Sequence, residues 1–431
     1  MRNGAEAAGF REGVAPGNTS FAKKQAALPF SLLLAYLFLE YGRPQDILSF
    51  LRVLRLPGIT VALLTASMVA FGKFRLKGRQ STLFVLLLVL MVIHGPIATN
   101  NYWALVIFIA MAMNFVVFLA LTHLVDQPEK YDRLVKVWLG VHVFLSIIGI
   151  VKQGRGIGGF LNDENDFCLA MNMVIPLSFF LAMNETGKKR LYFLVVTSLF
   201  LFVIILTGSR GGFVGLCVSM LYCWLKTKRK LLTALIMGLL AVVAVLVAPS
   251  SYWDEVRSIT EEGTSKGTGA ERIYTWGVGW HMFLDNPVMG VGQGNFPYAF
   301  RKYEVEVGHG EEGYHGRSVA GRAAHSIYFT MLPELGIVGT GIILLMVFHM
   351  FKDLKAIKSR SGRSGPRKYR RPNPLSNRNY ALALGLEGGL ISFLISGAFI
   401  SVLYYPNVWV LMGFIASLKT ISSQETDPSS A

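Results

Sequence analysis

The feature that most constrains this chain is a succession of apolar stretches, each about as long as a lipid bilayer is thick. About 20 apolar residues in a helix cross a hydrocarbon core of roughly 30 Å, and we identify about twelve such stretches. Hydrophobic residues make up 52% of the chain, charged residues make up 16%, and the mean hydropathy is +0.46. This balance excludes a soluble domain of 431 residues. The sequence therefore predicts an all-α polytopic membrane protein with about twelve transmembrane helices.

The predicted spans divide the chain unevenly. They are expected near residues 29–42, 57–72, 81–98, 102–124, 134–151, 166–184, 191–207, 211–225, 231–248, 323–350, 380–403 and 406–418. The first nine, in residues 29–248, are joined by short turns, whereas a large loop of residues 249–322 precedes the last three, in residues 323–418. The remaining segments are an N-terminal tail (1–28), a basic linker (352–379) and a C-terminal tail (419–431).

The positive charges follow membrane topology. The formal net charge is +16, and 29 of the 42 Lys and Arg residues fall on one side if the N-terminus is cytoplasmic. The positive-inside rule then places both termini and the basic linker in the cytoplasm, and the large loop outside. We expect the linker to lie near anionic lipid headgroups, and we do not expect a nucleic-acid partner. Three cysteines, Cys168, Cys217 and Cys223, all fall inside predicted spans, so neither a disulfide framework nor a zinc site is indicated.

The large loop carries helical signals. Ile273, Trp276, Trp280 and Phe283 recur at three- and four-residue steps, which predicts an amphipathic helix at the membrane interface. An Asp-Asn-Pro sequence follows it and should end it. A glycine-rich turn comes next, and a second short helix is expected over residues 298–303. We therefore expect a large periplasmic loop that contains short amphipathic helices.

His325 is the candidate catalytic residue, because it stands where the large loop re-enters the membrane. An imidazole has an ordinary pKa of about 6.5, so it can accept a proton from a hydroxyl group at neutral pH. The alternative is a structural histidine that is bonded to a backbone carbonyl.

Two arginines are candidates for binding an anionic substrate. Arg210 follows a span in Thr207-Gly208-Ser209-Arg210-Gly211-Gly212, where its planar guanidinium and the next helix N-terminus both suit phosphate oxygens. Arg272 lies in the large loop. Arg210 is otherwise an anchor at the membrane interface, and Arg272 is otherwise an ion-pair partner of a loop carboxylate.

Acidic residues offer other interpretations. Asn162-Asp163-Glu164-Asn165-Asp166 has the carboxylates for a divalent cation, although carboxylates at a helix N-terminus also complement the helix dipole, which we favour. Glu334 and Glu387 fall inside predicted spans and are candidates for a proton pathway in a transporter. The glycines of the large loop lack the context of a dinucleotide site, and no P-loop or Gly-x-Ser-x-Gly motif is present.

Three motifs in order resemble the O-antigen ligase and polymerase superfamily. They are the Thr207–Gly212 turn, the loop sequence Glu271-Arg272-Ile273-Tyr274-Thr275-Trp276 with Asn286-Pro287 and Gly290-Val291-Gly292, and the sequence from His325-Ser326-Ile327-Tyr328 to Glu334-Leu335-Gly336. The resemblance covers roughly residues 160–345. An opening Tyr41-Gly42-Arg43-Pro44-Gln45-Asp46 is also similar to the branch of exosortase-A-associated O-glycosylation ligases.

The resemblance implies a glycosyltransferase of the bacterial inner membrane that acts on the periplasmic side. Such proteins transfer a glycan from undecaprenyl diphosphate to an acceptor, without a metal or cofactor. It implies that Arg210 and Arg272 hold the diphosphate and that His325 is the essential histidine. Residues 162–165 depart from the family, which usually has a sequence closer to Pro-Asn there.

Three further residues complete the predicted substrate-binding set, namely Tyr274, Gln293 and Arg322. Aromatic side chains such as Tyr274 suit sugar stacking and interfacial anchoring equally well. The acceptor is expected to carry a hydroxyl group, on a lipid A core, a protein or a polysaccharide. The alternatives are a polymerase that extends a lipid-linked glycan, a transporter or flippase of an anionic or lipid-linked solute, and a scaffold without catalytic activity.

Overall fold

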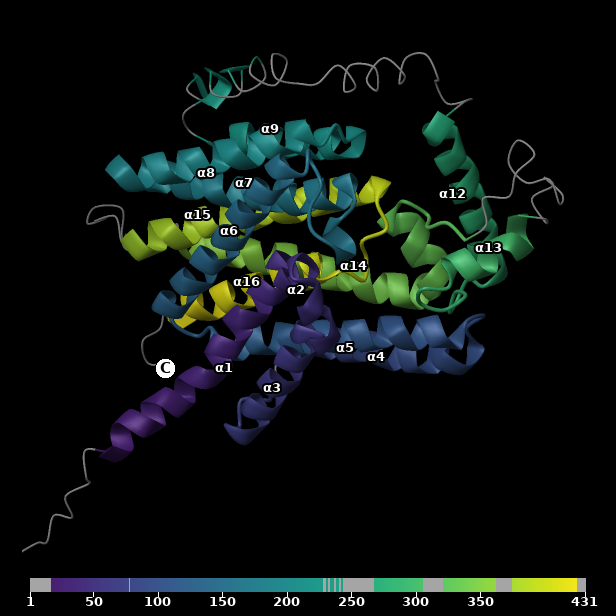
Figure 1. The fold of residues 1–431 in the computed structure, drawn as a ribbon, viewed down its shortest axis with the longest axis horizontal. Coiled ribbons are helices and arrows are strands. Elements are labelled where there is room, and N and C mark those ends of the chain that lie inside the picture. The colour runs from purple at the N-terminus through teal and green to yellow at the C-terminus, as the bar shows by residue number, and fades with distance from the viewer. Residues whose placement is uncertain are drawn as a thin grey trace, which may run out of the picture.

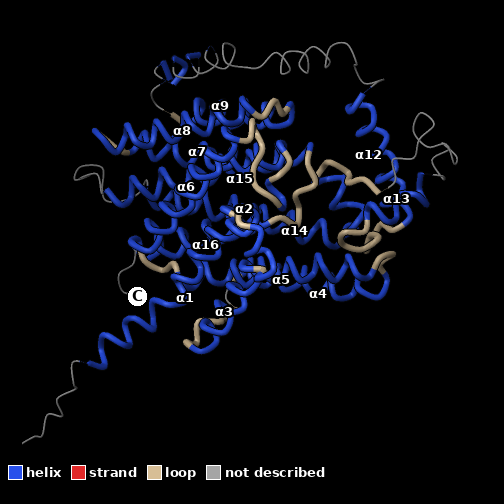
Figure 2. Tube along the Cα trace, viewed as in Figure 1, coloured by secondary structure: helices blue, strands red, loops and turns tan. Residues whose placement is uncertain are grey.

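A computed structural model describes most of the chain. It describes residues 17–76, 78–227, 267–304, 321–361 and 374–424, with residues 230, 231, 233–235, 238, 239 and 242. Every regular element within these residues is a helix (Figures 1 and 2). Eight of the described helices are long and apolar enough to cross a membrane. The predicted class, an all-α polytopic membrane protein, is confirmed.

Within residues 17–226 the helices follow one another with short connections. In chain order they are α1 (Gly17–Gly42), α2 (Pro44–Ile47), η1 (Ser49–Leu54), α3 (Leu56–Ala70), α4 (Arg79–Ile97), α5 (Asn101–Leu124), α6 (Pro128–Val151), η2 (Gly159–Leu161), α7 (Glu164–Asn184), α8 (Gly187–Leu206), α9 (Arg210–Lys226), α12 (Gly267–Asp285), α13 (Phe296–Glu304), α14 (Ile327–Ser361), α15 (Pro374–Ser396), η5 (Gly397–Phe399) and α16 (Pro406–Gln424).

A described helix coincides with each predicted span except one. The exception is the predicted span 231–248, most of which lies outside the described residues. Among the others, α1, α9 and α16 are helical but are not among the eight that qualify as membrane spans. Twelve spans therefore remain a prediction.

The basic linker is shorter than its composition predicts. Helix α14 continues to Ser361 and α15 begins at Pro374, so both invade the predicted linker of residues 352–379. The extension of α14 is amphipathic, because Leu354 and Ile357 are fully buried. Basic residues in its last turn also complement the helix dipole, which the sequence interpretation did not weigh against the polar composition.

Helix α7 forms the centre of the bundle. It packs against α8, α9 and α15, and nearly all of its apolar span is buried (Figure 1). Helix α15 approaches it closely at Gly385 and Gly389, where an added Cβ would lie 2.6 Å from backbone atoms of Leu177 and Met173. Small residues at such crossings allow helices in a membrane to gain dispersion energy from close backbone contact. The N-terminus of α7 is thereby held in one place relative to α9.

The predicted helices of the large loop are confirmed, and they gather at one end of the bundle. Figure 1 shows α12 and α13 at the right, beside the start of α14. Their shared core contains Val278, Met282, Phe296 and Phe300, together with Ala324 from the segment before α14. This small core gives the described part of the loop its own apolar support outside the main bundle.

A kink in α14 receives the turn that follows α12. Gly336 has φ 59° and ψ −166°, values that break the helix and that glycine adopts without strain. Carbonyl oxygens of Pro333 and Glu334 accept hydrogen bonds of 2.8 and 3.0 Å from the backbone N–H groups of Val291 and Gly292. The loop thus satisfies carbonyl groups that the kink exposes, as buried backbone in a membrane protein requires.

Candidate functional site

His325 occupies a strained backbone position just before α14. Its φ is +48°, in the left-handed region that non-glycine residues seldom adopt. The preceding carbonyl, that of Ala324, accepts a hydrogen bond of 2.8 Å from Nε1 of Trp276. The same indole stacks on Phe329, with ring centroids 5.0 Å apart and planes 3° from parallel. A side chain of α12 thus bonds the backbone just before His325 and packs on a side chain of α14 just after it, the kind of support that strained functional residues need.

Burial and nearby charges lower the pKa of the His325 imidazole. The pKa of His325 is lowered from its ordinary value, first by partial burial and then by the nearby cation of Arg272. Asp163 acts in the opposite direction and Arg322 lowers the pKa further. Burial and the two arginines thus favour the unprotonated imidazole, and Asp163 acts against them. Residues 162 positions apart in the sequence therefore meet at one site.

Arg272 lies in the same cluster of charges. Its pKa is lowered by burial first and next by the cation of Arg210, whereas Asp163 raises it. No ion pair joins the Arg272 guanidinium to any carboxylate in the described part of the chain. Arg272 and Arg210 thus lie close enough for their charges to act on each other, and neighbouring guanidinium groups can stabilise an anion.

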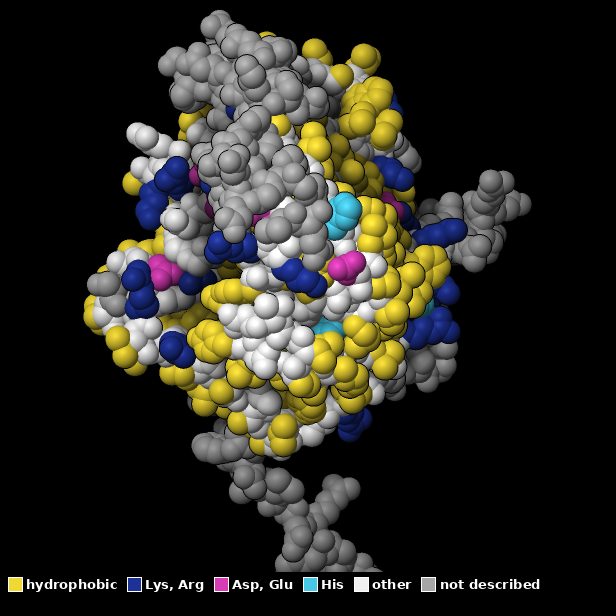
Figure 3. Space-filling model, turned by 90° about the vertical axis from the view of Figure 1, so that its right-hand side faces the viewer, with side chains coloured by type: hydrophobic (Ala, Val, Ile, Leu, Met, Phe, Trp, Pro, Cys, Tyr) yellow, Lys and Arg dark blue, Asp and Glu magenta, His cyan; other side chains and the backbone are white. Residues whose placement is uncertain are grey.

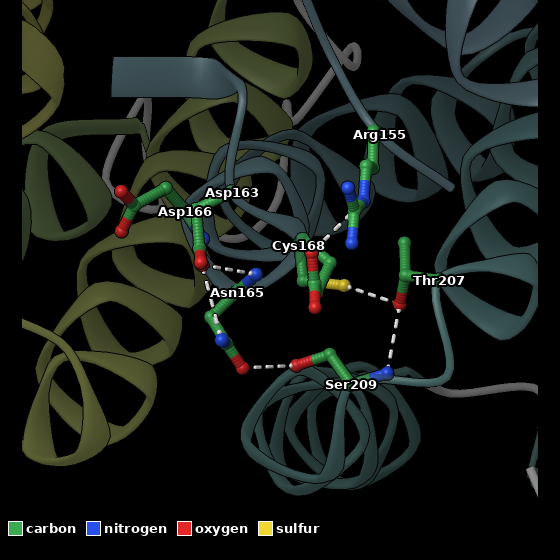
Figure 4. Close-up of polar contacts among 8 residues, drawn as sticks. Arg155, Asp163, Asn165, Asp166, Cys168, Thr207 and Ser209 are labelled. Atoms are coloured by element: carbon green, nitrogen blue, oxygen red, sulfur yellow. Dashed lines mark hydrogen bonds and ion pairs between the residues drawn. The ribbon is translucent and has the colours of Figure 1, made fainter. Parts of the chain in front are cut away.

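The turn before α9 positions Arg210 at the first residue of that helix. Ser209 is the N-cap, and its Oγ accepts a hydrogen bond of 2.9 Å from the backbone N–H of Gly212. The same hydroxyl donates 2.6 Å to Oδ1 of Asn165 at the start of α7 (Figure 4). Thr207 accepts a hydrogen bond of 3.1 Å from the Ser209 N–H. These contacts fix the arginine turn to the N-terminus of α7.

Asp163 caps helix α7, as the favoured interpretation of the acidic cluster predicts. Its carboxylate accepts hydrogen bonds from the backbone N–H groups of Asn165, at 2.8 Å, and Asp166, at 3.4 Å. Glu164 forms an ion pair with Arg155 at 3.4 Å (Figure 4). Within the described residues no group of three or more His, Cys, Asp or Glu side chains is arranged to hold a metal ion.

Arg322 and Tyr274 lie in the same region as His325, and each has a protein partner. Arg322 forms an ion pair with Glu271 of α12. The hydroxyl group of Tyr274 donates a hydrogen bond of 3.3 Å to Oε1 of Glu304, at the end of α13. The first contact ties the segment before His325 to α12, and the second ties α12 to α13.

Gln293 was predicted to bind substrate, but its side chain is buried in contacts within the protein. Its side chain is 0% exposed. Nε2 donates hydrogen bonds of 3.0 Å to the carbonyl oxygens of Met91 and Ala104, and Oε1 lies 2.9 Å from Nδ1 of His94. The amide thus joins the loop to α4 and α5, and we do not include Gln293 in the site. Sequence position alone could not distinguish a glycine-rich turn open to substrate from one that is pressed against the bundle.

The two intramembrane glutamates are engaged in structural contacts. The carboxylate of Glu334 accepts hydrogen bonds from the N–H groups of Gly294 (2.8 Å) and Phe296 (2.9 Å) and from the hydroxyl of Tyr404 (2.6 Å). It therefore caps α13. Glu387 binds Lys358 and the hydroxyl group of Tyr222, each at 2.5 Å.

Two residues of the site were not assigned these roles from the sequence. Asp163 was recognised as a helix cap, but its charge also acts on His325 and Arg272. Trp276 was recognised as an interfacial aromatic, but its contacts with Ala324 and Phe329 support His325. The sequence held no signal for either pairing, because the partners come from different helices.

The end of the molecule that carries α12 and α13 has a mixed surface. Figure 3 shows acidic, basic and histidine side chains there, separated by hydrophobic ones rather than joined in one basic patch. This agrees with the sequence of the large loop, where acidic residues outnumber basic ones by ten to seven.

Comparison with known proteins shows a similarity over part of the chain. Residues 193–344 match the family model described as O-antigen ligase, a range that includes Arg210, Arg272 and His325. The chain is also 24% identical over 339 residues to the teichuronic acid biosynthesis protein TuaE of Bacillus subtilis (strain 168). That alignment covers 69% of this chain and 63% of TuaE, less than two thirds of the relative's length. The chain is thus a multi-pass membrane protein whose residues 193–344 are similar to the O-antigen ligase family.

Proposed function

We propose that this protein is a membrane glycosyltransferase of the O-antigen ligase type. It transfers a glycan from undecaprenyl diphosphate to a hydroxyl group of an acceptor on the periplasmic face of the inner membrane. His325 is the general base, and Arg210 and Arg272 bind the diphosphate. The donor diphosphate is the leaving group, and the family resemblance implies that neither a metal ion nor a nucleotide takes part.

The observation that carries the proposal is that His325 lies near the cation of Arg272, which in turn lies near the cation of Arg210. An essential base must be unprotonated at working pH, and the lowered pKa of His325 meets that requirement. A diphosphate leaving group must be stabilised as its charge develops, and the Arg210–Arg272 pair meets that requirement. Both requirements are met within one cluster.

In the proposed reaction, one bond forms as another breaks, and the proton and the leaving group each have an acceptor. The acceptor hydroxyl loses its proton to the His325 imidazole while its oxygen forms a bond to C1 of the donor sugar. The bond between C1 and the diphosphate oxygen breaks, and its electron pair stays on undecaprenyl diphosphate. Arg210 and Arg272 neutralise part of that charge, and Arg322 lies at the edge of the site beside Glu271. Trp276 positions the backbone of the base, and Asp163 raises the pKa of its imidazole.

A polymerase is the second candidate. The TuaE relative is named for teichuronic acid biosynthesis, so transfer of a glycan onto another lipid-linked glycan is compatible with the same site. A transporter is disfavoured, because the contacts of Glu334 and Glu387 join helices to each other and to the large loop.

The test is transfer by the purified full chain in liposomes, with a defined undecaprenyl-diphosphate glycan as donor. His325→Ala is compared with the wild type and with His281→Ala, a matched control on an exposed histidine of α12. We expect His325→Ala to lower the rate by about 10²–10⁴-fold, the usual contribution of a general base. His281→Ala should keep the wild-type rate.

The products separate the candidates. A single glycan block that is added to a co-purified acceptor indicates a ligase, and a ladder of glycans on undecaprenyl diphosphate indicates a polymerase. Donor that crosses the bilayer intact indicates a transporter and contradicts the proposal. Wild-type transfer by His325→Ala would remove the base from the mechanism.

A further inference from the structure

A cavity lies at the end of the bundle opposite His325. Helix α14 begins two residues after His325 and runs for 35 residues, about 50 Å at 1.5 Å per residue. The cavity has a volume of about 550 Å³ and lies where the last turns of α14, α5 and α16 meet the first turn of α4. It is therefore separate from the proposed catalytic site, and the charge pattern places it on the cytoplasmic side.

Acidic side chains in the cavity wall are already paired. Asp353 forms an ion pair of 2.6 Å with Lys419 and accepts a hydrogen bond of 3.4 Å from Gln80. Asp126 forms an ion pair of 2.7 Å with Lys130. Neither carboxylate therefore neutralises the other cations of the wall.

Three cations of the wall remain, namely Arg79, Lys352 and Arg360. None is paired with a carboxylate in the described ranges of the chain. Nη1 of Arg360 is buried without a hydrogen-bond partner among the described residues. A buried unsatisfied donor costs about 1–3 kcal/mol, and more when it is charged. An anion in the cavity would remove that cost.

The arrangement goes beyond the excess of basic residues expected at a cytoplasmic surface. Lys355, on the same stretch of α14, does not line the cavity. It is exposed to solvent, as is expected of an ordinary surface cation. Arg360 is instead turned inward, so that its Nη1 is shielded from solvent. The guanidinium group offers a planar pair of donors that matches two oxygens of a phosphate group.

We propose that this cavity binds a phosphate group through Arg79, Lys352 and Arg360. The phosphate belongs either to the headgroup of an anionic phospholipid or to a soluble phosphate compound. Phe118 and Ala416 also line the cavity and add apolar surface that suits the glycerol and upper acyl carbons of a lipid. This binding does not depend on the proposed transfer reaction.

The test measures binding by the full chain in nanodiscs. Discs of phosphatidylcholine alone are titrated with inorganic pyrophosphate, and discs that also contain phosphatidylglycerol are analysed by native mass spectrometry for retained lipid. Arg360→Gln and Lys352→Gln remove cavity charges, and Lys355→Gln removes the same charge from the exposed side of α14. We expect both cavity variants to weaken binding, Arg360→Gln by at least about tenfold, and Lys355→Gln to bind as the wild type does.

The outcomes separate the two sources of phosphate. Retention of phosphatidylglycerol without pyrophosphate binding identifies a lipid headgroup, and binding of pyrophosphate alone identifies a soluble ligand. Binding of both identifies the phosphate group itself as what is recognised. If the wild type binds neither probe, or if Lys355→Gln weakens binding as much as the cavity variants, the proposal is wrong. Lys352 is exposed, so its variant keeps the test valid if Arg360→Gln does not fold.

Discussion

The indole Nε1 of Trp276 donates a 2.8 Å hydrogen bond to the carbonyl oxygen of Ala324, the residue before His325. This contact links α12 to a backbone position with φ +48°. Positive φ values outside glycine persist only where surrounding contacts impose them. The geometry of the proposed base therefore depends on a helix of the large loop.

Removal of this hydrogen bond should impair transfer without changing the acid–base behaviour of the site. We expect Trp276→Phe to lower kcat by about tenfold or more, because misplacement of a reacting group by about 1 Å can cost about 10²-fold. The pH below which kcat/KM falls, the acid limb of the pH profile, should stay the same, since no charge changes. Trp280→Phe, at an exposed indole of the same helix, is the control and should keep the wild-type kcat. Equal losses in both variants would contradict the positioning role.

Removal of the Arg272 charge should change both donor affinity and the pH profile. Arg272 lowers the pKa of His325, so Arg272→Gln should raise that pKa and move the acid limb of kcat/KM to higher pH. Loss of one charge-assisted contact should also raise KM for the lipid-linked donor by about 10–100-fold. Steady-state kinetics across pH measure both effects. An acid limb that stays in place would show that the titrating group is not His325.

Removal of the Asp163 charge should shift the pH profile in the opposite direction. Asp163 raises the pKa of His325, so Asp163→Asn should lower it and move the acid limb to lower pH. Asparagine is as good an N-cap as aspartate, so α7 should keep its stability. Thermal unfolding checks the second point, and an Asp163→Ala variant, which lacks the cap, should unfold more easily by about 1 kcal/mol.

Glu334→Gln tests whether the buried carboxylate is structural. A glutamine amide keeps one oxygen acceptor but presents N–H donors to a site that already contains the N–H groups of Gly294 and Phe296. We expect a loss of stability of about 1–3 kcal/mol and faster hydrogen exchange in α13. Tyr404→Phe removes only one donor and should have a smaller effect. Lost function with unchanged stability and exchange would instead favour a proton pathway.

Gly336→Ala tests the kink of α14. The position has φ +59°, and an added Cβ would lie 2.4 Å from the carbonyl oxygen of Val288. We expect the variant to be destabilised by more than about 1 kcal/mol, because the backbone of the loop must move away. Gly341→Ala is the matched control, since nothing lies within 4 Å of its Cβ position. Thermal unfolding of the two variants in the same detergent provides the comparison.

Much of the fold follows from the sequence alone, because each membrane helix satisfies its own backbone hydrogen bonds. The apolar stretches from residue 29 to residue 225 are helical, with ends close to the predicted ones, although α1 already begins at Gly17 and α6 at Pro128. The aromatic spacing of residues 273–283 likewise predicted α12. The basic linker was predicted less well, because two buried residues, Leu354 and Ile357, keep α14 helical to Ser361.

The sequence by itself determined the class of protein, the family resemblance and the candidates His325, Arg210 and Arg272, because these follow from local composition and ordered motifs. Only the tertiary structure decided which of the predicted residues meet. It placed Asp163 beside the charges of His325 and Arg272, and it buried Gln293 between α4 and α5. These relations depend on contacts between helices that are distant in the chain. Local periodicity carries no information about such contacts, which arise when the helices pack together.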